Sequence, residues 1–346
     1  MSLASFLRKR WGRKFRRRGT CGMEGEVMQN SNREGRACPQ DYRLPPQLFS
    51  ADPLLCCKTL YVVGGLYGNP FALTALDRLV EDEGEDSLVL LNGDMHWFDR
   101  SLEDFREIER RTAAYVRLAG NVERELCRSQ DVGVGCGCAY PSCVSDAAVS
   151  RSNSIHALLK EAFSQDKLLR VAMKGRPAAA VVDVAGRKVG VTHGDEKLVG
   201  GWRCSRESLR DGRRQVELGS WMERNGIDVF ATSHTCAPAA LRLGKGAVIN
   251  NGAAGLPNFR SQQYGLAIRV SSLPAHEALF GAACEGLFVD AVPLRYDHQA
   301  FLAWFDDLWP RASPAAVSYR DRITNGPDDD IAKALLGGFS PRHGLP

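Results

Sequence analysis

The sequence lacks any long hydrophobic run: no stretch reaches the about 18 apolar residues of a membrane-spanning helix. It also lacks a sustained heptad pattern and any internal repeat of about 20–50 residues, which excludes a long coiled coil and a solenoid. No apolar segment of a secretory signal is present at the start, so we expect a cytoplasmic protein. The eleven cysteines are an odd number in a chain of 346 residues. Reduced thiols, some of them metal ligands, therefore fit better than a disulfide framework.

Acidic residues are absent from the first 20 positions, which hold eight Lys and Arg. The rest of the chain carries 37 basic and 41 acidic residues, so a mildly acidic body follows a basic arm. The polar composition of residues 1–45 predicts a solvated, disordered arm. Such an arm could contact an anionic partner, such as a phosphate or an acidic lipid, or serve as a transit peptide.

The remaining pattern indicates an α/β domain over residues 55–310. Strand–loop–helix units beginning near 59, 87 and 114 predict a parallel sheet with crossover helices. The second half is richer in antiparallel hairpins, so we expect two stacked mixed sheets with helices outside, a four-layered α-β-β-α sandwich. We expect insertions near 124–175 and 196–226, and a Pro/Gly-rich tail over 311–346.

Short polar signatures with glycine follow the predicted strands. Four of these side chains stand at successive strand ends: Asp94, Asn121, His193 and His234. Because chemistry in open α/β sheets gathers at the carboxyl ends of strands, we expect them to lie together. One carboxylate, one amide oxygen and two imidazoles suit Zn²⁺, Mn²⁺ or Fe²⁺.

The order of these signatures resembles the calcineurin-like metallophosphoesterase superfamily, over roughly residues 59–297. Its pattern is Asp-x-His, Gly-Asp, Gly-Asn-His-Glu/Asp, a strand-end His, and Gly-His-x-His. The resemblance implies a four-layered sandwich and a metal-dependent phosphoesterase acting on a phosphate-ester substrate. It assigns one metal to the same four residues, Asp94, Asn121, His193 and His234.

The departures concern the second metal of the family. The first Asp falls on Gly65 and its partner His on Tyr67, while Val122 replaces the His of the Gly-Asn-His block. The last His falls on Cys236, which we expect to be a thiolate ligand. The resemblance therefore implies one metal site and leaves the second with few of its ligands.

Other residues could compensate. His96, two residues after Asp94, is a candidate second ligand or general acid, and Asp94, His96, Asn121 and His234 form the expected catalytic set. Cys136-Gly137-Cys138, with Cys143 close by, could bind a soft metal. Two alternatives to a phosphoesterase stay open: a degraded, non-catalytic scaffold for protein binding, and a thiolate-metal or redox variant built on Cys136, Cys138 and Cys236.

Overall fold

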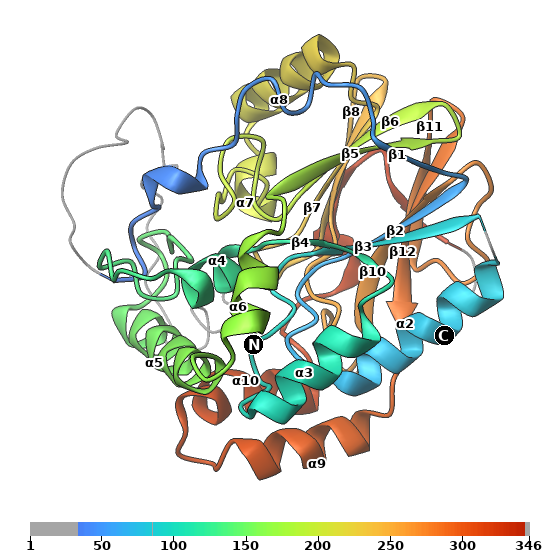
Figure 1. Cartoon of the computed structure of the whole chain (residues 1–346). Helices are drawn as coiled ribbons and strands as arrows, with labels where there is room; N and C mark the ends of the chain where they lie inside the picture. The colour runs from blue at the N-terminus through green and yellow to red at the C-terminus, as the bar shows by residue number, and fades with distance from the viewer. Residues whose placement is uncertain (1–33, 85, 343–346) are drawn as a thin grey trace, which may run out of the picture.

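The computed structural model describes residues 34–84 and 86–342. Two seven-stranded mixed sheets pack face to face, and helices cover their outer faces (Figure 1). This is the α-β-β-α sandwich expected from the sequence. Within the described residues, no helix is both long enough and apolar enough to span a bilayer.

The first sheet has the strand order β14-β11-β12-β10-β2-β3-β4. Its strands are β2 (Thr59–Val63), β3 (Ser87–Asn92), β4 (Val116–Leu118), β10 (Gly265–Ser271), β11 (Phe280–Cys284), β12 (Leu287–Leu294) and β14 (Ser340–Pro341). β2, β3 and β4 run parallel, whereas β10 pairs antiparallel with both β2 and β12. The carboxyl ends of β3 and β4 therefore meet at one edge.

The second sheet has the order β1-β5-β6-β7-β9-β8-β13. Its strands are β1 (Leu55–Cys57), β5 (Ala179–Val184), β6 (Arg187–Thr192), β7 (Val229–Thr232), β8 (Ala239–Leu243), β9 (Gly246–Asn250) and β13 (Leu335–Gly337). β6, β7 and β9 are parallel neighbours, and antiparallel β5 and β8 flank them. β6 and β7 consequently deliver their last residues to a common edge.

Strand side chains alternate between two apolar layers. Leu60 and Val62 of β2 pack in the core between the sheets with Val189 and Val191 of β6, all fully buried. Tyr61 and Val63 point the other way, toward α2 (Pro70–Glu83) and α3 (Leu102–Arg111). The opposite face of the second sheet is covered by α7 (Arg206–Leu209) and α8 (Gly212–Asn225).

Further helices surround the strand ends that carry the polar signatures (Figure 1). They are α4 (Asn121–Cys127), α5 (Asp146–Phe163), α6 (Lys167–Lys174), α9 (His298–Leu308) and α10 (Pro314–Asn325). α7 and α8 are separate helices, because the Asp211 side chain accepts the N–H groups of Arg213 and Arg214 and begins a new helix.

The boundary of the expected amino-terminal arm is wrong within the described residues. Residues 40–42 form the short helix η1 (Gln40–Tyr42), and the Tyr42 side chain is fully buried. Its hydroxyl donates to Glu125 Oε1 at 2.8 Å. An aromatic ring of this size contributes too much apolar burial for a solvated arm. The basic run lies in residues 1–33, outside the described residues. The expected contact of this run with an anionic partner therefore stays a prediction.

The expected carboxyl-terminal tail over 311–346 is also corrected. Ser313 caps α10 through the N–H of Ala316, and the helix buries Ile323 and Arg322. Beyond it follow η2 (Ile331–Ala334) and strands β13 and β14, which extend the two sheets. A Ser followed by Pro at the first helical position was the local signal for this helix.

Candidate metal centre

The backbone that presents Asp94 is held by a neighbouring carboxylate. Asp94 follows β3 with a left-handed backbone, φ 52°. The buried side chain of Glu123 accepts the backbone N–H groups of Asp94 and Met95 at 2.9 and 2.8 Å. A third N–H, from Gly120, donates to Glu123 at 2.8 Å. Glu123 thus ties the end of β3 to the start of α4, and Asp94 Oδ1 accepts the N–H of Val122 at 3.2 Å.

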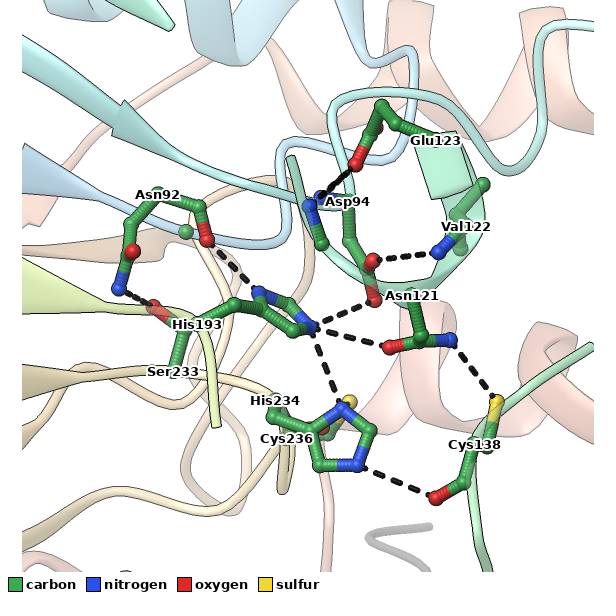
Figure 2. Close-up of polar contacts among 12 residues, drawn as sticks. Asn92, Asp94, Asn121, Val122, Glu123, Cys138, His193, Ser233, His234 and Cys236 are labelled. Carbon is green, nitrogen blue, oxygen red and sulfur yellow. Dashed lines mark hydrogen bonds and ion pairs between the residues drawn. The ribbon is translucent and has the colours of Figure 1, made fainter. Parts of the chain in front are cut away.

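His193, at the end of β6, turns one ring nitrogen into the centre (Figure 2). Its Nδ1 lies 2.7 Å from the carbonyl oxygen of Asn92, which can only accept, so Nδ1 carries the hydrogen. This bond leaves Nε2 free toward the site. Nε2 lies 3.2 Å from each of Asp94 Oδ2, Asn121 Oδ1 and His234 Nδ1.

His234, after β7, is fixed in the opposite tautomer. Its Nε2 donates to the carbonyl oxygen of Cys138 at 3.2 Å, so its unprotonated Nδ1 faces His193. One ligand atom from each of Asp94, His193 and His234 lies within 4.8 Å of the others. Two imidazole lone pairs and a carboxylate oxygen therefore converge on one point, which is the donor set of a Zn²⁺, Mn²⁺ or Fe²⁺ site.

Asn121 completes the group through the orientation of its amide. Its Nδ2 donates to the carbonyl oxygen of Cys136 at 3.0 Å and contacts Cys138 Sγ at 3.3 Å. The amide oxygen is thereby left facing His193. The four side chains expected at strand ends are brought together, and each has its ligand atom fixed by a second contact.

The protonation of the cluster indicates that a positive charge belongs between these atoms. Burial opposes charge on His193, but Asp94 raises the pKa of the imidazole above its usual value. Burial and the neighbouring His193 lower the pKa of His234 to about 3. Burial would raise the pKa of Asp94, but His193 holds it below the usual value. One proton thus serves three groups, and the residues fit a divalent cation in its place.

The sequence matches no protein-family model and no curated protein. Among solved structures, a hypothetical protein from Pyrococcus horikoshii OT3 is similar, with a TM-score of 0.52 and 14% identity over 78% of this chain and 99% of that chain. A metallophosphoesterase from Sphaerobacter thermophilus gives a TM-score of 0.49 and 13% identity, over 78% and 99% of the two chains. The likeness to the Pyrococcus protein shows a shared fold, which here is the α-β-β-α sandwich of two mixed sheets. Zinc-bound Vps29 from Entamoeba histolytica gives a TM-score of 0.33 and 14% identity, over 68% and 99%.

The positions that depart from the metallophosphoesterase pattern lie beside the converging ligands. Tyr67 Oη and Cys236 Sγ lie 2.7 Å apart, although 169 residues separate them in sequence. Gly65 has φ 66°, and a Cβ there would lie only 2.9 Å from the Tyr67 ring. The ring therefore fills the space that a side chain at position 65 would need. On this side the structure places a glycine, a tyrosine ring and a thiol where the pattern has an aspartate and two histidines.

Cys236, which we expected among the metal ligands, does not join the converging ligand atoms in this structure. Its sulfur lies outside the group formed by Asp94, His193 and His234 and contacts Tyr67 instead. Burial raises the pKa of the Cys236 thiol, and burial also holds the pKa of Tyr67 well above its usual value. Both groups are neutral in this arrangement, so a thiolate ligand is not what the geometry presents.

His96 is likewise not part of the centre, neither as a ligand nor as a general acid. Its ring is fully buried, stacks on Phe105 with centroids 4.3 Å apart, and engages both nitrogens elsewhere. Nδ1 bonds Asp99, and Nε2 lies 2.9 Å from Glu109 Oε1. Burial opposes its charge, but the two carboxylates raise the pKa of His96 to about 10. It is an imidazolium with no free nitrogen.

A small cavity of about 20 Å³ lies over the centre, lined by Asp94, His234, Cys138, Cys236 and an aromatic wall. The wall consists of Tyr67, Trp97, Tyr140, Trp202 and Tyr319. Among the described residues that line the cavity there is no Lys or Arg. The volume suits about one water molecule. Sequence reasoning missed this wall because its members come from five separate segments.

Proposed function

We propose that this protein is a metal-dependent phosphoesterase with a single divalent ion held by Asp94, Asn121, His193 and His234. The observation that carries the proposal is the pair of imidazole lone pairs facing each other at 3.2 Å beside a carboxylate and an amide oxygen. Without a cation or a proton between them, such an arrangement is repulsive. The fold supports the reaction class, because the same strand ends carry metal ligands in metallophosphoesterases.

When bound, a divalent ion lowers the pKa of a coordinated water from 15.7 toward about 7 and polarises a phosphate oxygen. The chain's own residues prepare the place for it. Asn92 keeps His193 in the tautomer that offers Nε2, and Glu123 holds the backbone of Asp94. The aromatic wall narrows the cavity over the centre to the size of about one water, so we expect an ester to reach the centre only when that wall moves.

Elemental analysis of the purified full chain, followed by hydrolysis assays, tests the proposal. We expect about one equivalent of Zn, Mn or Fe per chain, and hydrolysis of nitrophenyl phosphate mono- or diesters that a chelator abolishes. Asp94→Asn should lose both metal and hydrolysis, whereas His96→Gln, outside the centre, should retain the metal. Hydrolysis that persists in a metal-free, folded Asp94→Asn protein would contradict the proposal.

A second candidate is a metal-stabilised binding scaffold without hydrolysis. The small cavity and the Tyr67–Cys236 contact in place of the second cation favour it. This protein would bind the metal as tightly as an enzyme but would show no turnover of any phosphate monoester or diester. The same two measurements therefore separate the candidates: metal with turnover, or metal without it.

A further inference from the structure

We propose that Cys136 and Cys138 form a reversible disulfide, and that its closure weakens metal binding at the centre. The second half of this statement rests on the metal site proposed above. The first half stands on the geometry of the Cys136-Gly137-Cys138 turn alone. The pair is a modification site, and three contacts join it to Asn121 and His234.

The turn places the two sulfurs side by side. Gly137 has φ 67°, and a Cβ there would lie 2.2 Å from Tyr42 Oη, so only glycine fits. Its N–H donates to the carbonyl oxygen of Val134 at 3.0 Å, which closes the turn. The Sγ atoms of Cys136 and Cys138 lie 2.8 Å apart, less than 1 Å longer than the about 2.05 Å of a disulfide bond. Small side-chain rotations suffice to join them.

The same turn orients two of the four proposed metal ligands. The carbonyl oxygen of Cys136 and the sulfur of Cys138 both face Asn121 Nδ2, which fixes the amide oxygen toward the centre. The carbonyl oxygen of Cys138 accepts from His234 Nε2 at 3.2 Å and from Trp202 Nε1 at 2.8 Å. Any rearrangement of this turn therefore changes the orientation of Asn121 and His234.

A small oxidant can reach one of the two sulfurs. Cys138 lines the cavity over the centre, whereas Cys136 is fully buried behind it. The cavity of about 20 Å³ admits a molecule close to the size of water, such as hydrogen peroxide. Cys138 is therefore the attacking thiol and Cys136 the resolving one. Burial keeps Cys138 protonated by raising its pKa, so the reaction is slower than that of an exposed cysteine.

The reaction balances with peroxide as the two-electron oxidant. Cys138 sulfur, losing its proton, attacks one peroxide oxygen and breaks the O–O bond, which gives a sulfenic acid and one water. The Cys136 sulfur then attacks the sulfenic sulfur and forms the S–S bond. The hydroxyl leaves with the proton of the Cys136 thiol as a second water. Two thiols and one peroxide thus become one disulfide and two waters. An external dithiol reverses the change by thiol–disulfide exchange.

Closure is expected to lower the affinity for metal. The sulfurs must draw together, which moves Cys138 Sγ away from Asn121 and turns the peptide planes on both sides of Gly137. The contacts that orient metal ligands are worth about 10- to 100-fold in metal affinity when lost. We expect the dissociation constant for Zn²⁺ to rise about tenfold in the oxidised protein.

Peptide mass mapping of the folded, full-length protein tests the disulfide itself. Trypsin releases residues 129–151 as one peptide, which contains Cys136, Cys138 and Cys143. After peroxide treatment, removal of the oxidant and alkylation, we expect this peptide to carry one alkylated cysteine. Its mass should be two hydrogens lower than that of the same singly alkylated peptide with two free thiols. Treatment with a dithiol before alkylation should restore three alkylated cysteines. Cys143→Ser should retain the mass loss, and Cys136→Ser should abolish it. Three alkylated cysteines in the treated wild-type peptide would overturn the proposal.

Zn²⁺ titration by calorimetry tests the coupling, with Asp94→Ala as the blank for zinc bound elsewhere. We expect the Asp94-dependent binding to weaken about tenfold after peroxide and to recover after reduction. Cys138→Ser, which removes the attacking thiol and keeps both carbonyl groups, should not respond to peroxide. Cys284→Ser, which replaces a buried cysteine of β11, should respond like the wild type.

The experiments distinguish failure of the disulfide from failure of its coupling to metal binding. A disulfide that forms while the Asp94-dependent affinity stays the same or rises overturns the coupling. Absence of Asp94-dependent zinc binding in both the reduced and the oxidised protein overturns the metal site, and the coupling with it. In that case the mass of the peptide still decides whether Cys136 and Cys138 are joined.

Discussion

Two buried clusters of histidine and carboxylate start from the loop that follows β3, and they differ in how their lone pairs are matched. In the first, which contains Asp94, His193 and His234, two imidazole nitrogens face each other without a hydrogen for each. In the second, both nitrogens of His96 face carboxylates, those of Asp99 and Glu109. Asp94 and His96 are separated by one residue, yet their surroundings are opposite.

In the second cluster each charged group contacts a group of opposite charge. Glu109 also pairs with Arg176 and with Arg117, the latter at 2.9 Å, so every charge has a partner of opposite sign. The first cluster has fewer hydrogens than acceptor atoms, and a cation can take the place of the missing hydrogens. The comparison teaches that buried His and Asp residues indicate a metal site only where acceptor atoms outnumber the hydrogens available to them.

Removing a carboxylate from the first cluster should have the largest effect. Asp94→Ala deletes the oxygen that lies 3.2 Å from His193, and we expect metal affinity to fall by more than about 100-fold, beyond the loss of an outer contact. Elemental analysis after dialysis measures it. His96→Gln is the matched change in the second cluster and should leave the metal content intact. A folded Asp94→Ala protein with full metal content would place the site elsewhere.

The second cluster should instead govern stability. Glu109→Ala leaves His96, Arg176 and Arg117 without their common carboxylate, and breaking a buried ion pair costs about 3–5 kcal/mol. Urea unfolding with the metal removed measures the loss. The surviving folded fraction should bind metal normally. If Glu109→Ala unfolded at the same urea concentration as the wild type, the cluster would contribute nothing to the fold.

The loss of unfolding free energy at acid pH should also depend on Glu109. Burial alone would raise the pKa of Glu109, but His96 and Arg176 lower it from 4.5 to about 2. A depressed pKa contributes stability above pH 4.5, and this contribution of roughly 3 kcal/mol is lost as the pH falls through about 2. Glu109→Gln should therefore flatten the unfolding free energy between pH 5 and pH 2. An unchanged slope in the variant would assign the acid sensitivity to other groups.

The elements and the convergence of the four strand-end side chains were predictable because both depend on local patterns. Apolar runs marked the strands, and the carboxyl ends of parallel strands share an edge wherever the sheet forms. The same logic failed for His96, which also follows a strand end, because its partner Glu109 is brought back by α3. No strand-end rule includes a contact made one helix later.

The aromatic wall and the contact between Tyr67 and Cys236 were not predictable for a similar reason. Tyr67 meets Cys236 across 169 residues, and neither residue type predicts a mutual contact. Tyr319 arrives on α10, in a segment whose Pro and Gly content suggested a tail. Its helix is held by packing of Ile323 and Arg322 rather than by a strong apolar stripe. Tertiary packing decided these positions, and a single sequence does not report it.

The smallest effect should come from substitution of Cys236. It tests whether metal binding at Asp94, His193 and His234 depends on the neighbouring contact between Cys236 and Tyr67. Cys236→Ser keeps a hydrogen-bonding group opposite Tyr67 Oη, so the free energy of unfolding should change by about 1 kcal/mol or less. Since the sulfur lies outside the group of Asp94, His193 and His234, the metal content should match the wild type. Tyr67→Phe, which removes the other partner of the same contact, should behave alike. A loss of metal in Cys236→Ser but not in Tyr67→Phe would make the sulfur a ligand that turns inward when the ion binds. Equal metal content in all three proteins would leave the centre with its four strand-end ligands alone.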